Sequence, residues 1–225
     1  MDIFNEIRDR KVTVGIAGVL LLVALISIWS QMCATTPKMN HKLYYGIGQV
    51  VALETIAAVR DHGQIVAVID GTFTMAGAAH ADEWQEFQRE LEKHPGVSLS
   101  ATKSVEIDLN DTSTGCSSQD FKKLMEEYSD VDAIVFFISL PEWKWLQQHQ
   151  LTPQRLPPNV IVVDEGMLPS QGHYTEYFAS SYVSKLIATR RDAPPALPGA
   201  PKTPREWFDK YYQIYTPQNF ETLPE

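Results

Sequence analysis

Cysteine is scarce in this sequence. Two cysteines occur among 225 residues, Cys33 and Cys116, and they lie far apart in the chain. A pair with this separation builds neither a disulfide framework nor the closely spaced CxxC of a structural zinc site. The cysteines therefore do not identify a redox compartment.

Basic residues are also few. The chain has 19 Lys and Arg against 28 Asp and Glu, which gives a net charge of -9. Because proteins that bind nucleic acid need a basic surface, we expect no nucleic-acid partner. The composition, 44% hydrophobic and 21% charged, is that of a globular protein, and the length suits one domain plus an anchor.

The common catalytic motifs are missing. The sequence has no GxSxG elbow, no GxxxxGK[ST] loop, no HExxH, and no GxGxxG after a strand. The six histidines are scattered without the spacing of metal ligands: His41, His62, His80, His94, His149 and His173. We therefore expect no enzyme, no cofactor and no metal. One catalytic alternative stays open, a hydrolase or transferase that uses Asp164 and Glu165 as acid and base.

The longest uncharged run lies near the N-terminus. No charged residue occurs from position 12 to position 32, a length that lets a helix cross a hydrocarbon core of about 30 Å. Trp29 lies near the far end of this run and three basic residues lie between positions 8 and 11. This pattern predicts a transmembrane helix at 12–32, with residues 1–11 in the cytoplasm and the rest outside a bacterial inner membrane.

The same run has two alternative interpretations, a cleaved secretory signal and a lipoprotein signal. The apolar run is longer than the roughly 7–15 residues of a secretory signal core, and no small-x-small cleavage site follows it. Cys33 follows Ser30, Gln31 and Met32, whereas a lipoprotein signal needs small residues before its cysteine. Both comparisons favour a single-pass membrane protein.

After a connector at 33–45, helical and strand-like patterns alternate through a soluble domain at 46–191. Helical spacing is present at 46–60, 82–94 and after the capping pair Ser117 and Asp120, and Pro141 suits the first turn of another helix. Apolar β-branched runs predict strands at 64–69, within 97–107, at 133–139, at 159–163 and within 182–189. This alternation predicts an α/β fold with a doubly wound, mostly parallel sheet.

Two segments carry a family resemblance. The runs GIGQVVALETIAAVRDHGQIVAVIDGTF from Gly46 and FKKLMEEYSDVDAIVFFISLPEW from Phe121 are similar to the second lobe of periplasmic sugar-binding proteins and of the related LacI-type regulators. The segment Ser129–Phe136 matches the family's "PDVDAIF" pattern. The resemblance covers 46–166, about half of the chain. It implies half of a type I periplasmic-binding-protein fold.

The resemblance and the sheet together place a candidate ligand site. Ligands of open parallel sheets bind beyond the carboxyl ends of the strands. The residues expected there are Asp70, Thr72, Thr74, Ser139, Glu142, Asp164 and Glu165. Such an acidic, hydroxyl-rich edge suits a sugar, or a divalent cation held by Asp70 and Asp164. The alternative is that these residues are solvated loops and turns.

The C-terminal segment, residues 192–225, combines a proline-rich strap with an aromatic helix. Prolines at 194, 195, 198, 201 and 204 predict a stiff spacer, and Thr203 to Glu206 predict a capped helix start. The aromatic residues that follow are Trp207, Phe208, Tyr211, Tyr212 and Tyr215. These rings pack either on the parent domain or on a partner protein.

These observations lead to two principal hypotheses about function. Binding proteins of the resembled family close two lobes over a ligand, whereas this chain has room for one lobe after its anchor. The leading hypothesis is a non-catalytic accessory subunit, whose lobe and aromatic tail bind other subunits of a membrane complex. The alternative is a membrane-tethered receptor that binds a sugar or another small polar solute at the strand-end edge.

Overall fold

The computed structural model describes residues 40–71, 79–105, 115–150, 152, 159–165, 171–190 and 200–222. These residues belong to one compact unit, Asn40–Glu225. The predicted membrane helix at 12–32 lies outside the described residues, and so does the predicted cytoplasmic segment 1–11. No helix in the described part combines the length and the apolar character needed to cross a membrane.

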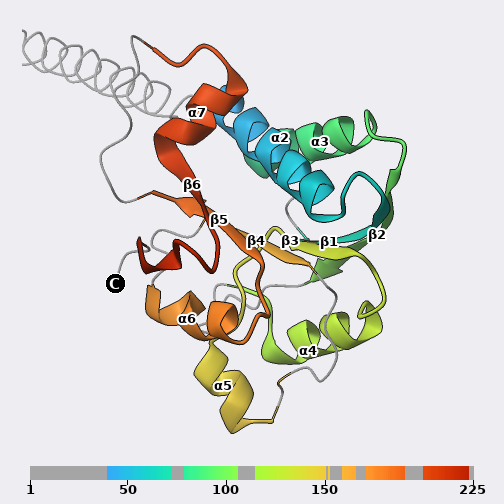
Figure 1. The fold of residues 1–225 in the computed structure, drawn as a ribbon, viewed down its shortest axis with the longest axis vertical. Helices are drawn as coiled ribbons and strands as arrows, with labels where there is room; N and C mark the ends of the chain where they lie inside the picture. The colour runs from blue at the N-terminus through green and yellow to red at the C-terminus, as the bar shows by residue number, and fades with distance from the viewer. Residues whose placement is uncertain are drawn as a thin grey trace, which may run out of the picture. The chain divides into compact units, whose positions relative to one another are not determined.

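A six-stranded sheet forms the centre of the unit (Figure 1). The strand order is β2-β1-β3-β4-β5-β6, and every neighbouring pair is parallel except β5 and β6. The strands are β1 (Gly63–Asp70), β2 (Val97–Val105), β3 (Ala133–Phe136), β4 (Val160–Asp164), β5 (Lys185–Thr189) and β6 (Tyr212–Tyr215). The predicted α/β fold with a mostly parallel sheet is confirmed.

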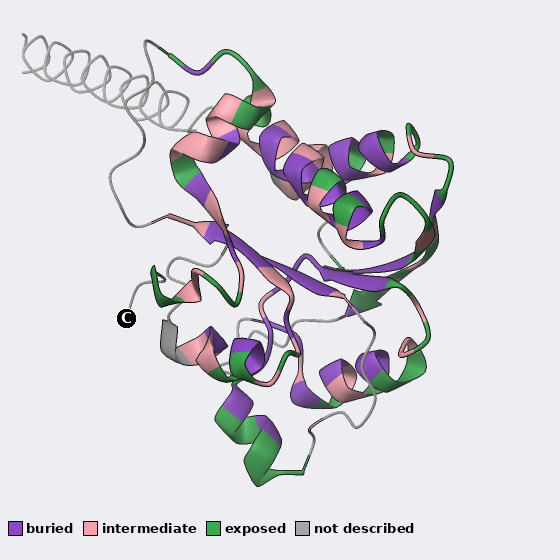
Figure 2. Cartoon of the chain, viewed as in Figure 1, coloured by how far each residue is buried: buried purple, intermediate pink, exposed green. Residues whose placement is uncertain are grey.

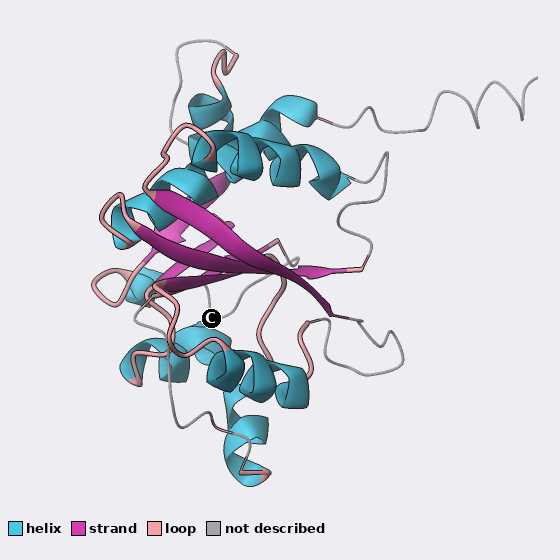
Figure 3. Ribbon diagram, turned by 90° about the vertical axis from the view of Figure 1, so that its right-hand side faces the viewer, coloured by secondary structure: helices cyan, strands magenta, loops and turns pink. Residues whose placement is uncertain are grey.

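Helices cover both faces of the sheet (Figures 1 and 3). On one face lie α2 (His41–Ala58), α3 (Ala79–Leu91) and α7 (Pro204–Tyr211). On the other face lie α4 (Ser118–Glu127), α5 (Trp143–Gln148) and α6 (Gln171–Ala179), and the short 3-10 helix η1 (Phe220–Thr222) contacts α6. The caps predicted from sequence are present, since Ser117 accepts from the Asp120 N–H and Thr203 forms a capping box with Glu206.

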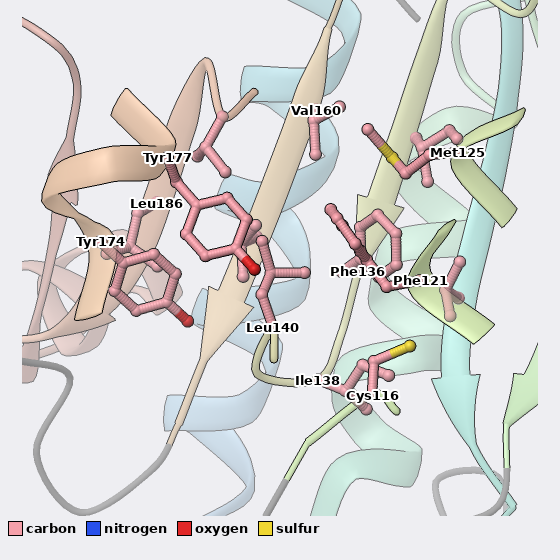
Figure 4. Packing of buried hydrophobic residues seen from close by; sticks show 14 of the residues in the cluster. Cys116, Phe121, Met125, Phe136, Ile138, Leu140, Val160, Tyr174, Tyr177 and Leu186 are labelled. Carbon is pink, nitrogen blue, oxygen red and sulfur yellow. The ribbon is translucent and has the colours of Figure 1, made fainter. Parts of the chain in front are cut away.

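The runs of the central strands β1, β3 and β4 are apolar because both faces of these strands are covered. Residues 65–69 of β1 are all buried (Figure 2). Their side chains alternate between two hydrophobic clusters, one on each face of the sheet. On the face of α4 and α6, Phe121 lies against Phe136 with ring centroids 5.7 Å apart, and Tyr174 and Tyr177 fill the space beside β4 (Figure 4). The core therefore consists of two layers divided by the sheet.

Two glycines let three helices pack closely on the same face. A Cβ atom at Gly46 would lie 2.3 Å from the backbone oxygen of Pro204 in α7, and one at Gly48 would lie 2.1 Å from that of Glu83 in α3. Since neither approach leaves room for a side chain, α2 is fixed between α3 and α7. This arrangement brings the first turn of α3 close to the sheet edge described below.

Two predicted boundaries were wrong. The helix expected from residue 46 begins at His41, inside the predicted connector 33–45, because Leu43 continues the apolar stripe of Ile47 and packs against the same cluster. The aromatic helix expected through Tyr215 ends at Tyr211, and β6 follows. Tyr212 has extended backbone angles, and its strand pairs antiparallel with β5, which decides the structure of this segment.

Candidate functional site

The carboxyl ends of β1, β3 and β4 meet at one edge of the sheet. The Phe137 N–H donates to the Val68 carbonyl, so β1 and β3 end side by side, with Asp70 and Ser139 just beyond this bond. The chain leaves β1 through α3 on one face and leaves β3 through α5 on the other, which makes this edge a topological switch point. Asp70 and Ser139 are half-buried there. Thr72 and Thr74 lie outside the described residues.

Asp164, at the end of β4, is held by two hydroxyl groups. Ser139 Oγ donates to Asp164 Oδ1 at 2.8 Å, and the Tyr174 hydroxyl donates to Asp164 Oδ2 at 2.6 Å. The aspartate is 4% exposed. Burial, together with the neighbouring Asp164, raises the pKa of Tyr174, so this phenol stays protonated and keeps donating. Asp164 thus ties β3, β4 and α6 together.

Glu165, the next residue, faces the other side of the sheet. It meets two side chains from the start of α3, His80 and Glu83. His80 Nδ1 lies 3.5 Å from Glu83 Oε2 and 3.5 Å from Glu165 Oε1. The structure therefore separates Asp164 from Glu165 and does not place them in one acid–base pair.

The His80–Glu83–Glu165 group, called the α3 cluster below, lies partly beneath the surface. Its three side chains are exposed by 34%, 0% and 17%, respectively, so the cluster opens toward solvent through His80. The Tyr44 ring from α2 meets the His80 ring edge-on, with centroids 5.7 Å apart. The Tyr212 hydroxyl from β6 hydrogen-bonds to Glu165. Four elements of the fold thus contribute to the cluster or its surroundings.

The α3 cluster shifts the protonation of its own members. The neighbouring carboxylates of Glu165 and Glu83 raise the pKa of His80 to about 10. Burial, and next the charge of Glu165, raises the pKa of Glu83. Burial alone would raise the pKa of Glu165, but its interactions with Glu83, His80 and Tyr212 outweigh burial and lower it. At neutral pH, Glu165 therefore carries the negative charge and His80 the positive charge.

Most of this cluster was missed from sequence. The scattered histidines gave no expectation of a metal ligand among them. The spacing of His80 and Glu83, three residues apart on one helix, places both side chains on the same face and is the signal that points to them. Glu165 was a predicted ligand-binding residue, and only the catalytic alternative paired it with Asp164.

A hollow of about 180 Å³ lies at the opposite end of α3. Its lining residues are Gln88, Leu91, Glu92, Val97 and Leu99, from the end of α3 and the start of β2. A helix rises about 1.5 Å per residue, so this hollow is far from the first turn of α3. It belongs to the amino end of the sheet and contains no residue of the predicted site.

The aromatic tail packs mostly on its own domain. Phe208, Tyr212 and Tyr215 are buried in the two core clusters, with exposed fractions of 1%, 7% and 1%. Trp207 is half-buried and Tyr211 is 40% exposed, and their rings stack with centroids 6.1 Å apart. Only these two of the five predicted partner-binding rings remain accessible to another protein.

Comparison with known proteins supports the fold. No family model and no curated protein sequence matches the chain. An arabinose-binding protein from Geobacillus stearothermophilus is similar in structure, with a TM-score of 0.50, 13% identity and coverage of 81% of this chain and 63% of that protein. A solute-binding protein from Burkholderia graminis, solved with D-arabinose, gives a TM-score of 0.49, 16% identity and coverage of 83% and 63%.

A sugar-binding protein of an ABC transporter from Bacillus halodurans gives a TM-score of 0.48, 15% identity and coverage of 80% of this chain and 63% of that one. The chain spans less than two thirds of the length of each of these three proteins. At such low identity the likeness shows the fold alone. The likeness to the arabinose-binding protein confirms the fold implied by the sequence resemblance, that of the periplasmic sugar-binding proteins.

Proposed function

We propose that this chain is a membrane-tethered, non-catalytic module that binds a small polar solute, such as a sugar or polyol, at the carboxyl edge of its sheet. The main support is the switch point between β1 and β3, where Asp70 and Ser139 are half-buried and offer a carboxylate and a hydroxyl group. Residues 12–32 supply the tether in this proposal, with residues 1–11 in the cytoplasm and the module outside the inner membrane of a bacterium.

The chemistry of this edge suits sugar hydroxyl groups. Carboxylates accept hydrogen bonds from hydroxyl groups, and a few well-placed polar groups fix the orientation of a ligand in its site. Ser139 is held in place through its bond to Asp164, so its hydroxyl oxygen is positioned before a ligand arrives. Since one lobe encloses only part of a ligand, we expect weak binding unless a second protein covers the other side.

Thermal unfolding of the full-length protein in mild detergent tests this proposal. The assay uses a panel of pentoses, hexoses and polyols, with EDTA present to remove metal ions. A ligand at about 100 times its Kd adds about 2.7 kcal/mol of stability, which raises the Tm of a domain of this size by roughly 5–11 °C.

Matched variants locate the binding. Asp70→Asn should lower or abolish the increase in Tm, because it removes a charged acceptor at the switch point. Asp61→Asn is the control, since Asp61 is exposed before β1, at the amino end of the sheet. If no sugar or polyol changes the Tm of the wild type, solute binding by this module is wrong.

A second candidate function is that of an accessory subunit, and the accessible pair Trp207 and Tyr211 favours it. Trp and Tyr are enriched among the residues that contribute most to binding at protein interfaces. Lys210 Nζ lies 5.8 Å and 5.2 Å from the two ring centroids and helps to hold the rings in place. A native pull-down from mild-detergent membranes should recover a stoichiometric partner with the wild type. The Trp207→Ala, Tyr211→Ala double variant should lose that partner, and Trp145→Ala on α5 should keep it. Recovery of the wild-type chain alone would exclude this function.

A further inference from the structure

Glu83 is a buried carboxyl group without a well-formed hydrogen bond. Its side chain is 0% exposed, and among the described residues no group donates to either oxygen with hydrogen-bond geometry. The His80 ring lies beside it, with Nδ1 3.5 Å from Glu83 Oε2. Because a buried carboxyl group is costly unless it is paired or coordinates a metal, Glu83 indicates an ion that completes its surroundings.

We propose that the α3 cluster binds a divalent transition-metal ion of the zinc class through His80, Glu83 and Glu165. One nitrogen and two carboxylate oxygens, one from each residue, all lie within 4.8 Å of one another. In a tetrahedral zinc site, bonds of about 2.1 Å place neighbouring ligand atoms about 3.4 Å apart. The two nitrogen–oxygen separations in the cluster are 3.5 Å, so an ion fits with little movement of these side chains. The ion takes the place of the proton that His80 otherwise carries, and this proton is released to solvent on binding.

The set of donor atoms favours zinc over the alkaline-earth ions. Imidazole nitrogen is a preferred ligand of zinc and its neighbours in the periodic table, whereas Ca²⁺ takes six to eight oxygen ligands and Mg²⁺ an octahedral oxygen shell. The cluster offers one nitrogen and the carboxylates of two glutamates. Three protein ligands leave a fourth position for water, on the side where His80 reaches solvent.

The residues around the cluster hold the ligands in place. The Tyr212 hydroxyl bonds to Glu165, and the Tyr44 ring packs edge-on against His80. Removing a group that orients a metal ligand in this way commonly lowers the metal affinity by about 10–100-fold. The bound ion joins the first turn of α3 to the end of β4, so it stabilises the folded chain.

The test measures metal binding to the full-length protein in mild detergent after treatment with EDTA, with no sugar present. Isothermal titration with zinc chloride should show one ion per chain, and zinc should raise the Tm. Calcium chloride and magnesium chloride should bind at least about tenfold more weakly. X-ray absorption at the zinc edge should show nitrogen and oxygen ligands at about 2.0–2.1 Å.

Three variants locate the ion, and one serves as control. Glu83→Gln and His80→Gln should each weaken zinc binding by at least about tenfold, and Tyr212→Phe should weaken it by about tenfold. His41→Gln should leave zinc affinity unchanged, although His41 pairs with Asp82 of the same helix as the ligands His80 and Glu83. The absorption spectrum of the wild type gives an answer even if a variant does not fold.

Three results would overturn the proposal: no zinc binding by the wild type, equal zinc affinity in the wild type and in both ligand variants, or calcium binding as tight as zinc binding. The inference does not depend on the proposed solute binding. The sugar panel is measured in EDTA, and the zinc titration is measured without sugar. A negative result in one experiment therefore does not contradict the proposal that the other experiment tests.

Discussion

The close approach of α2 to α3 predicts that Gly48→Ala destabilises the protein. A Cβ atom at this position would lie 2.1 Å from the Glu83 backbone oxygen and 3.0 Å from Glu86 Cβ. Favourable contacts between carbon atoms occur at about 3.5–4.0 Å, so both approaches are repulsive. Since the nearer atom belongs to the backbone, a side-chain rotation cannot relieve the contact, and α3 must move away from α2.

The expected loss of stability follows from two opposing effects. Adding a methyl group to a well-packed core costs typically about 1–3 kcal/mol, and the backbone contact at Gly48 places this variant at the upper end of that range. Alanine favours an α-helix over glycine by up to about 1 kcal/mol. The net loss is about 2 kcal/mol. For a domain of this size, the Tm should fall by roughly 4–8 °C.

Thermal unfolding followed by circular dichroism measures this change. The control is Gly71→Ala, because among the described residues a Cβ atom there meets the Ser104 hydroxyl alone, at an ordinary 3.6 Å. Its Tm should stay within about 1 °C of the wild type, as expected for a substitution away from core packing. A Gly48→Ala variant as stable as the wild type, or more stable, would refute the argument that the two helices are in backbone contact.

Three further predictions have clear expected outcomes. Tyr174→Phe removes a hydrogen bond to the buried carboxylate at the end of β4 and should lower the free energy of unfolding in urea by about 1.5–3 kcal/mol; a loss below about 0.5 kcal/mol would contradict this. Burial raises the pKa of the Cys116 thiol to about 12, so in a Cys33→Ser background it should resist iodoacetamide at pH 8 until urea unfolds the chain. As pH rises, the thiol ionises in the unfolded chain before it ionises in the folded protein. The contribution of Cys116 to the free energy of unfolding is therefore constant below pH 9 and falls as pH rises toward 12. Cys116→Ala should reduce this fall in stability. In the same urea assay, Phe208→Ala should lower the free energy of unfolding by about 3–5 kcal/mol, and Tyr211→Ala should lower it by less than about 1 kcal/mol. Equal losses of stability in the two variants would show that α7 does not pack as described.

The strands and helix caps could be predicted because their causes are local. The uninterrupted apolar runs of β1 and β3 reflect burial on both faces, and this pattern is visible without knowledge of the strand order. The capping interactions of Ser117 and of Thr203 with Glu206 join residues three positions apart. Each of these predictions needed only the residues of one element.

Elements that depend on a distant partner could not be predicted in the same way. The segment Tyr212–Tyr215 follows a well-capped helix, so its aromatic residues were assigned to that helix. Its structure is set by β5, whose exposed edge accepts it as an antiparallel strand from Leu186 to Thr189. The pairing also removes part of the unpaired edge that β5 would otherwise present to solvent.

One alternative left open by the sequence, an acid–base pair of Asp164 and Glu165, does not match the geometry, and the reason is visible in the sequence. Successive side chains of a strand point to opposite faces of the sheet, so neighbours at a strand end are directed toward different layers. Asp164 meets Tyr174 of α6, whereas Glu165 meets His80 and Glu83 of α3. Because this alternation holds at the end of β4, the sequence pattern alone is enough to place the two acids on opposite faces of the sheet. It also directs Glu165 toward a residue of the helix that covers its own face, although the sequence does not say which helix that is.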